Sequence, residues 1–63
     1  MRINGQDRTI ERCSIREMLQ RLELGERGIA VALNGVVIPR SQWQATIIEE
    51  EDSVEVVTAA AGG

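Results

Sequence analysis

The last five residues of the chain, 59–63, read AAAGG and carry no charge and almost no side-chain bulk. We expect them to form a flexible tail after a folded domain of residues 1–58. Five extended residues reach about 17 Å, and alanine and glycine are slim enough to enter a channel that larger side chains would block. The chemical group that such a tail delivers is the α-carboxylate of Gly63. The alternative is a frayed end without a function.

A carboxylate must be activated before it can react, because its pKa of about 3.5 leaves it anionic at neutral pH. The usual biological route is an acyl-adenylate made from ATP. The chain has no lysine, no histidine and no glycine-rich loop ending in Lys-Ser or Lys-Thr, so it lacks common general bases and a phosphate-binding loop for ATP. We therefore expect a protein that is not an enzyme, binds no cofactor, and is activated by a partner that consumes ATP.

The composition also argues against other classes of function. The formal net charge is −3, the seven arginines are scattered, and Trp43 is the single aromatic residue, which is atypical of a nucleic-acid-binding protein. One cysteine without histidine does not form a zinc site, and no apolar run is long enough for a membrane span. A lone thiol and an N-terminus without a signal peptide are typical of a cytoplasmic protein.

Three other features each have a functional and a structural interpretation. Cys13 could form a persulfide, although a packing role is favoured over it. Trp43 could anchor a partner or, slightly favoured, cap the edge of a thin core. The acidic residues 49–52 and Glu55 could steer docking onto a basic surface, although a solvated turn is favoured.

A helix is predicted after Ser14. Ser14 and Glu17 form a capping box, in which each side chain satisfies a free backbone N–H at the start of the helix. An apolar stripe with helical spacing follows, made of Ile15, Met18, Leu19 and Leu22. Gly25 is well placed to end this helix.

Strands are predicted on both sides of the helix. Residues 1–12 contain two short runs around Asn4-Gly5, a signal for a two-residue hairpin in which Ile3 and Ile10 point inward; a longer turn through residues 6–8 is the alternative. The later elements are a hairpin of residues 29–33 and 36–38 around Asn34-Gly35, a helical turn at 41–44 capped by Ser41, an edge strand or covering loop at 46–48, a charged turn at 49–53, and a last strand at 54–58.

This order predicts an α+β domain with a four- to five-stranded mixed sheet packed on one main helix, in two layers around one core. A β-grasp arrangement fits, with the last strand lying centrally and parallel to the first. Apolar residues on the sheet face away from the helix, such as Val37 and Val57, are either a docking patch or ordinary core.

Residues 31–43, VALNGVVIPRSQW, closely resemble the central segment of the bacterial sulfur carrier proteins of thiamine biosynthesis, the ThiS family. Residues 52–59 resemble the last strand of that family, and Gly62-Gly63 match its terminal pair. The resemblance is best from about residue 29 to the end. Ala60-Ala61 replaces larger or polar residues that are common in relatives.

The resemblance implies a ubiquitin-like β-grasp fold and a role as a sulfur carrier. In the family, a ubiquitin-activating-like adenylyltransferase uses ATP to adenylate the terminal glycine, and a cysteine-derived sulfur donor system then converts it to a thiocarboxylate. The thiocarboxylate donates its sulfur to thiazole synthase. Carried over to this chain, Gly63 is the site of adenylation and of the thiocarboxylate. Gly62, the small residue before it, helps to present Gly63 to the partner enzymes.

Other functions stay open alongside this one. The small subunit of molybdopterin synthase shares the fold and the ending, although those chains tend to be longer and lack the segment at residues 38–43. A ubiquitin-like protein modifier and a non-catalytic ubiquitin-like binding module are further alternatives. The binding module would keep full activity without Gly62 and Gly63.

Overall fold

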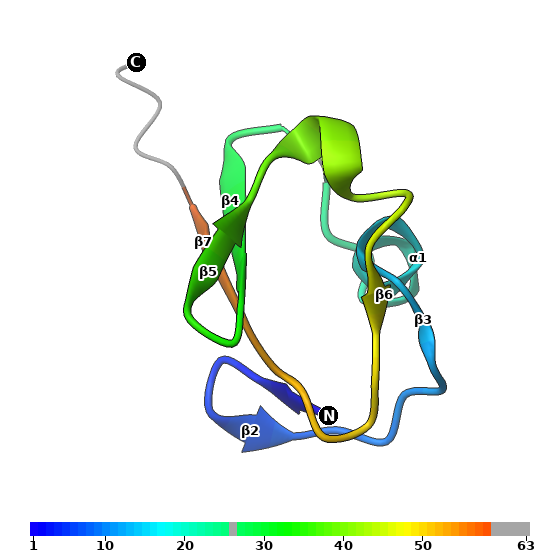
Figure 1. Ribbon diagram of the computed structural model, residues 1–63. Helices are drawn as coiled ribbons and strands as arrows, with labels where there is room; N and C mark the ends of the chain where they lie inside the picture. Colours follow the sequence, from blue (N-terminus) through cyan, green and yellow to red (C-terminus); the bar gives the residue numbers. More distant parts are fainter. Residues whose placement is uncertain (26, 59–63) are drawn as a thin grey trace.

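The computed structural model describes residues 1–25 and 27–58 (Figure 1). Its main sheet has five strands in the order β2-β1-β7-β4-β5, and a second sheet pairs β3 with β6. The strands are β1 (Arg2–Ile3), β2 (Gln6–Asp7), β3 (Cys13–Ser14), β4 (Ile29–Leu33), β5 (Val36–Ile38), β6 (Ile47–Ile48) and β7 (Ser53–Thr58). The helices of the described residues are the α-helix α1 (Ile15–Arg21) and the short 3-10 helix η1 (Arg40–Gln42).

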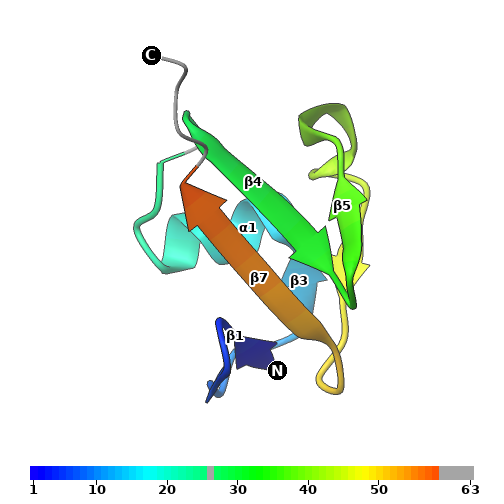
Figure 2. The same ribbon diagram turned by 90° about the vertical axis from the view of Figure 1, so that its left-hand side faces the viewer.

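Helix α1 covers one face of the five-stranded sheet, so the fold has two layers (Figure 1). Figure 2 looks onto the other face of this sheet, with β7 and β4 in front of the helix. The buried core between the layers consists of Ile3, Cys13, Ile15, Met18, Leu19, Val31, Trp43, Ile48 and Val54. The predicted α+β class, with a mixed sheet on one main helix, is confirmed.

The last strand, β7, lies at the centre of the sheet. It pairs in parallel with β1 and antiparallel with β4, so the predicted central position beside the first strand is confirmed. The pairing with β4 runs from Val54, opposite Leu33, to Thr58, opposite Ile29. The pairing with β1 is much shorter and ends where Ile3 lies opposite Val54.

Two Asn-Gly turns shape the two hairpins of the sheet. Their φ values are 52° at Asn4, 81° at Gly5, 50° at Asn34 and 85° at Gly35. Positive φ at both central residues is the geometry of a type I′ turn, whose twist matches that of the flanking strands. Ile3 pairs with Gln6 directly across the first turn. The two-residue hairpins are therefore confirmed, and the longer first turn is not formed.

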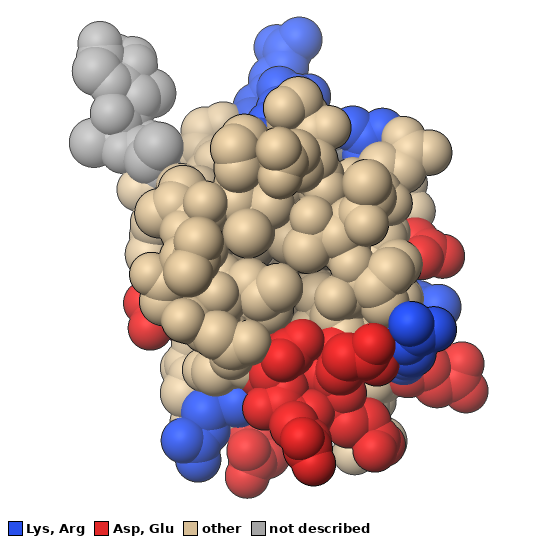
Figure 3. Space-filling model, in the orientation of Figure 1, with Lys and Arg blue, Asp and Glu red and all other residues tan. Residues whose placement is uncertain are grey.

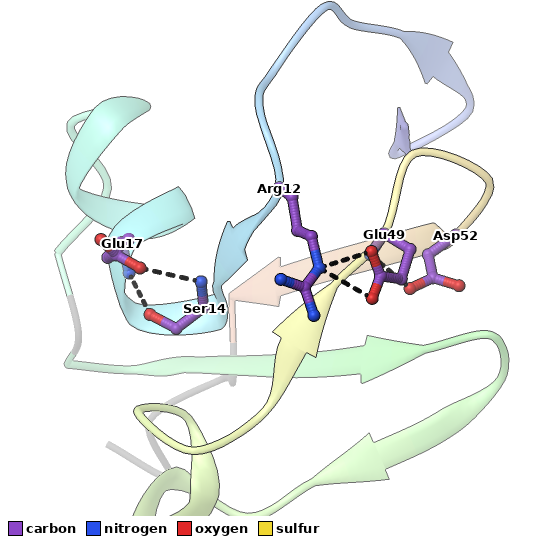
Figure 4. Close-up of polar contacts among 5 residues, drawn as sticks. All are labelled: Arg12, Ser14, Glu17, Glu49 and Asp52. Carbon is purple, nitrogen blue, oxygen red and sulfur yellow. Dashed lines mark hydrogen bonds and ion pairs between the residues drawn. The ribbon is translucent and has the colours of Figure 1, made fainter.

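The start of α1 agrees with the sequence prediction and its end does not. The Glu17 backbone N–H donates to Ser14 Oγ at 3.1 Å, and the Ser14 backbone N–H donates to Glu17 Oε1 at 3.0 Å, which completes the capping box (Figure 4). The prediction that Gly25 ends the helix is wrong. Glu23 takes the left-handed conformation at φ 57°, and the Leu24 N–H donates to the Leu19 carbonyl at 2.9 Å, a closure that usually uses glycine.

The segment after β5 also differs from the prediction. The helical turn begins at Arg40 rather than at Ser41, and Pro39, which has no side-chain cap, precedes it. The Gln42 N–H donates to the Pro39 carbonyl at 2.9 Å, so Ser41 lies inside the turn and does not cap it.

The segment left open as an edge strand or covering loop is a strand, β6. It pairs with β3 in a sheet of its own, with Cys13 opposite Ile48 and Ser14 opposite Ile47. The strand β3 was not predicted. No helix among the described residues has the length and apolar character needed to cross a membrane.

Candidate functional site

The two residues predicted to carry the chemistry, Gly62 and Gly63, lie outside the described residues. The described part of the chain ends at Thr58, the last residue of β7. The candidate site is therefore built from β7, which leads to residue 59, and from the surfaces around it. Within the described residues, no cluster of three or more Cys, Asp or Glu side chains could hold a metal ion.

The end of β7 is held differently on its two sides. On one side β4 pairs with it as far as Thr58. On the other side β1 stops at Val54, and the next contact is made by a side chain: the Val56 N–H donates to Asn4 Oδ1 at 2.8 Å. Figure 2 shows β1 beside only the first part of β7. Asn4 was predicted only as a turn residue, because the Asn-Gly pair accounts for the turn without this bond.

The sheet face away from α1 carries an apolar surface beside β7. Val37 lies opposite Ala32, and Val57 lies opposite Ala30; we call these four residues the outer patch. Val37 is 68% exposed and Val57 is 54% exposed. These valines are therefore not ordinary core, and Val57 is followed by Thr58, the last described residue.

The acidic residues 49–52 form a turn at the opposite end of β7, whereas Glu55 lies within β7, exposed and opposite Ala32. Acidic side chains gather there on the space-filling surface, where β6 leads into β7 (Figures 1 and 3). Asp52 organises the turn, because its Oδ2 accepts from the Glu49 N–H at 2.8 Å and its Oδ1 accepts from Asn34 Nδ2 at 2.9 Å. The hydrogen bond from Glu49, followed by that from Asn34, holds the pKa of Asp52 below its usual value.

Glu49 forms an ion pair with Arg12, the residue directly before β3. Arg12 Nε donates to both carboxylate oxygens of Glu49 at 2.8 and 2.9 Å (Figure 4). Both side chains are more than half exposed, so this ion pair contributes little to stability. Glu50 and Glu51 are exposed. The structure thus confirms the solvated turn. Within it, the Asp52 carboxylate stabilises the turn by accepting two hydrogen bonds.

Cys13 and Trp43 are both core residues. Cys13 is 4% exposed, and burial raises the pKa of its thiol, which is unfavourable for a reactive sulfur because the thiolate is the nucleophile. Trp43 is 2% exposed, and its indole Nε1 donates to the Ile38 carbonyl at 2.9 Å. The packing interpretation of each residue is confirmed, and a buried Trp43 does not offer its ring to a partner.

The chain is similar to known proteins over its full length. The model of the ThiS family matches residues 1–63. The sulfur carrier protein ThiS of Escherichia coli K12 is 32% identical over 50 residues, which cover 79% of this chain and 76% of that protein. The crystal structure of the thiamine biosynthesis protein ThiS from Geobacter metallireducens superposes with a TM-score of 0.87 at 30% identity, covering 98% of this chain and 96% of that one. The chain therefore belongs to the ThiS family.

Proposed function

We propose that this chain, as a ThiS-type sulfur carrier in thiamine biosynthesis, carries its sulfur on the α-carboxyl group of Gly63. In this proposal partner enzymes bind the described domain, and residues 59–63 enter their active sites. Ala59 to Gly63 have the small side chains that a narrow active-site channel requires. The chain itself supplies no catalytic residue, so partners perform each chemical step.

The first step is activation of the carboxylate by an adenylyltransferase of the ubiquitin-activating type. A carboxylate oxygen of Gly63 attacks the α-phosphorus of ATP, and pyrophosphate leaves. A hydrosulfide equivalent from a cysteine-derived donor system then attacks the carbonyl carbon, and the bond to AMP breaks. The products are AMP, a proton and the thiocarboxylate of Gly63, so one sulfur atom has replaced one oxygen atom.

The second step is delivery of the sulfur to thiazole synthase, which builds the thiazole ring. A thiocarboxylate sulfur is a better nucleophile than the oxygen that it replaces. Attachment to a protein also places the sulfur atom at the acceptor's reaction centre and keeps free sulfide out of solution. We assign this chemistry to the cytoplasm, where the reducing conditions suit both a thiocarboxylate and the unpaired Cys13.

Two observations together best support the proposal: the family match includes the terminal glycines, and the strand that precedes the tail is the central strand of the sheet. That match extends to Gly63, and β7 is the central strand of the sheet and ends at Thr58. In the sequence, residue 59 therefore directly follows the central strand of the sheet. The outer patch lies beside this point, and we expect the activating enzyme to contact it there.

The proposal is tested by intact-mass measurement after incubation with the activating enzyme, ATP and a sulfur donor. We expect a mass gain equal to the difference between one sulfur and one oxygen atom. The matched control is the chain without Gly63, which should fold normally and gain no mass. Absence of the mass gain in a system that converts another ThiS protein would refute the proposal.

A further inference from the structure

We propose that Asn4 is a positioning residue for activation of the tail. Its side-chain amide holds the last part of β7 in the direction from which residues 59–63 enter the partner's active site. This inference rests on the proposed function of Gly63. It assigns a role in that function to a residue far from Gly63 in the sequence.

The geometry follows from how the first hairpin is built. β1 has only two residues, and the chain turns away at Asn4 because this residue adopts a left-handed conformation. The Asn4 backbone N–H still donates to the Val54 carbonyl at 2.9 Å. The next bond along β7 cannot come from a β1 backbone carbonyl, and Asn4 Oδ1 accepts the Val56 N–H in its place. The side chain thus extends the ladder by one step.

This additional hydrogen bond lies in the part of β7 that pairs with a strand on one side only. From Val56 to Thr58, β4 pairs with β7 on one side, whereas on the other side the paired residues of β1 have ended at Val54. A strand segment that is bonded along one edge twists more easily than one bonded along both. The Asn4 bond therefore restrains the edge of β7 that faces β1 at Val56, two residues before the strand ends at Thr58.

Asn34 supplies a matched comparison within the same molecule. It occupies the same position in the other Asn-Gly turn, with nearly the same φ value. Its Oδ1 accepts from the Ser53 N–H at 2.9 Å, at the start of β7 and at the opposite end of the strand from Thr58. Removal of either amide takes a side-chain bond away from β7, but only Asn4 acts at the end that leads to Gly63.

The test compares Asn4→Gly, Asn4→Asp and Asn34→Gly with the wild-type chain. Glycine keeps the positive φ that each turn needs and deletes the amide, whereas the carboxylate of the Asn4→Asp variant keeps an oxygen acceptor. Activation is followed as ATP–pyrophosphate exchange catalysed by the activating enzyme, with the carrier concentration varied to separate kcat from KM. Amide hydrogen exchange at Val56 and urea unfolding are measured on the same samples.

For Asn4→Gly we expect kcat to fall roughly five- to tenfold, the factor that one net hydrogen bond can contribute, with KM little changed. Exchange at the Val56 amide should accelerate. Asn4→Asp should restore both quantities, and Asn34→Gly should lose stability without losing kcat.

Three results would overturn the inference: unchanged kcat in Asn4→Gly, equal losses of kcat in the two glycine variants, or a change confined to KM. A wild-type chain that the enzyme does not activate would instead refute the proposed function, and this inference with it.

Discussion

The indole of Trp43 and the backbone of Ile38 are joined by a hydrogen bond: Trp43 Nε1 donates to the Ile38 carbonyl oxygen at 2.9 Å. Ile38 is the last residue of β5, and Trp43 follows η1, so the bond closes the loop that leads from the edge of the sheet back to the core. The tryptophan ring is buried. One residue therefore fills the core and satisfies its own polar atom.

Substitution of Trp43 should separate these two contributions. Trp43→Phe removes the N–H and keeps most of the apolar volume, so we expect a loss of about 1 kcal/mol in the free energy of unfolding. Trp43→Ala also leaves a cavity and should lower the free energy of unfolding by about 3–5 kcal/mol. For a domain of this size, such a loss is enough to leave a large fraction of the molecules unfolded. Urea unfolding followed by circular dichroism measures both. Similar losses in the two variants would show that packing is not the main contribution of the ring.

Stability should decrease in acid because hydrogen bonds lower the pKa of two carboxylates, Glu17 and Asp52, in the folded state. The pKa of Glu17 is lowered by its bonds with Ser14, and the pKa of Asp52 is lowered by its bonds with the Glu49 N–H and Asn34. A lowered folded-state pKa means that the unfolded chain binds protons first as the pH falls. This stabilisation is complete above the ordinary values of 4.5 and 3.8, and it is lost as the pH falls through the lower folded-state values.

Asp52→Asn should therefore flatten the acid side of the stability profile. Urea midpoints measured at a series of pH values from neutral to strongly acidic give the slope. Glu51→Gln is the control, since it removes the same charge from the same turn but neither of the Asp52 hydrogen bonds. A profile that Glu51→Gln flattens as much as Asp52→Asn would point to general charge repulsion in the turn instead of these bonds.

The elements that the sequence predicted well are those specified by neighbouring residues. The capping box needs only Ser14 and Glu17, and a type I′ turn needs only Asn-Gly between two strands. Both depend on contacts over a few residues, so their patterns are visible in the sequence. The resemblance of residues 31–43 and of Gly62-Gly63 to the ThiS family supplied the predicted chemistry, which local patterns alone do not contain.

The features that sequence reasoning missed depend on contacts between distant residues or on an unusual local choice. Strand β3 exists because Cys13 and Ser14 meet β6, more than thirty residues later. The bond between Asn4 and Val56 spans 52 residues. Helix α1 ends through a left-handed Glu23, a conformation that costs energy for residues other than glycine, so the nearby Gly25 was the stronger signal. Val37 and Val57 are exposed because the register of β5, β4 and β7 places both on the sheet face away from α1.

Cys13 should be dispensable for the carrier function. Its thiol is buried and its pKa is raised by burial, so little thiolate is present at neutral pH. We expect Cys13→Ala to lower stability by about 1–2 kcal/mol and to accept sulfur on Gly63 as completely as the wild-type chain. Intact mass measures sulfur loading, and a thiol reagent should label the wild-type chain quickly only in denaturant. Loss of loading in a folded Cys13→Ala chain would assign the thiol a role in sulfur transfer.

The outer patch should be needed for docking and not for folding. Val37→Asp places a charge at an exposed site that we expect the activating enzyme to cover, and a residue central to an interface contributes more than about 1 kcal/mol to binding. We therefore expect KM for the carrier in ATP–pyrophosphate exchange to rise about tenfold, with the urea midpoint nearly unchanged.

Val36→Asp is the matched control for Val37→Asp. Val36 is the neighbouring residue of β5 and is similarly exposed, at 62%, but it alternates to the other face of the sheet. The two variants have the same charge change, on the same strand and at similar exposure, but the carboxylate lies on opposite faces of the sheet, opposite Ala32 in one and Leu33 in the other. A larger KM for Val37→Asp than for Val36→Asp therefore places the enzyme on the outer face, and equal KM values would exclude the outer patch as its contact surface.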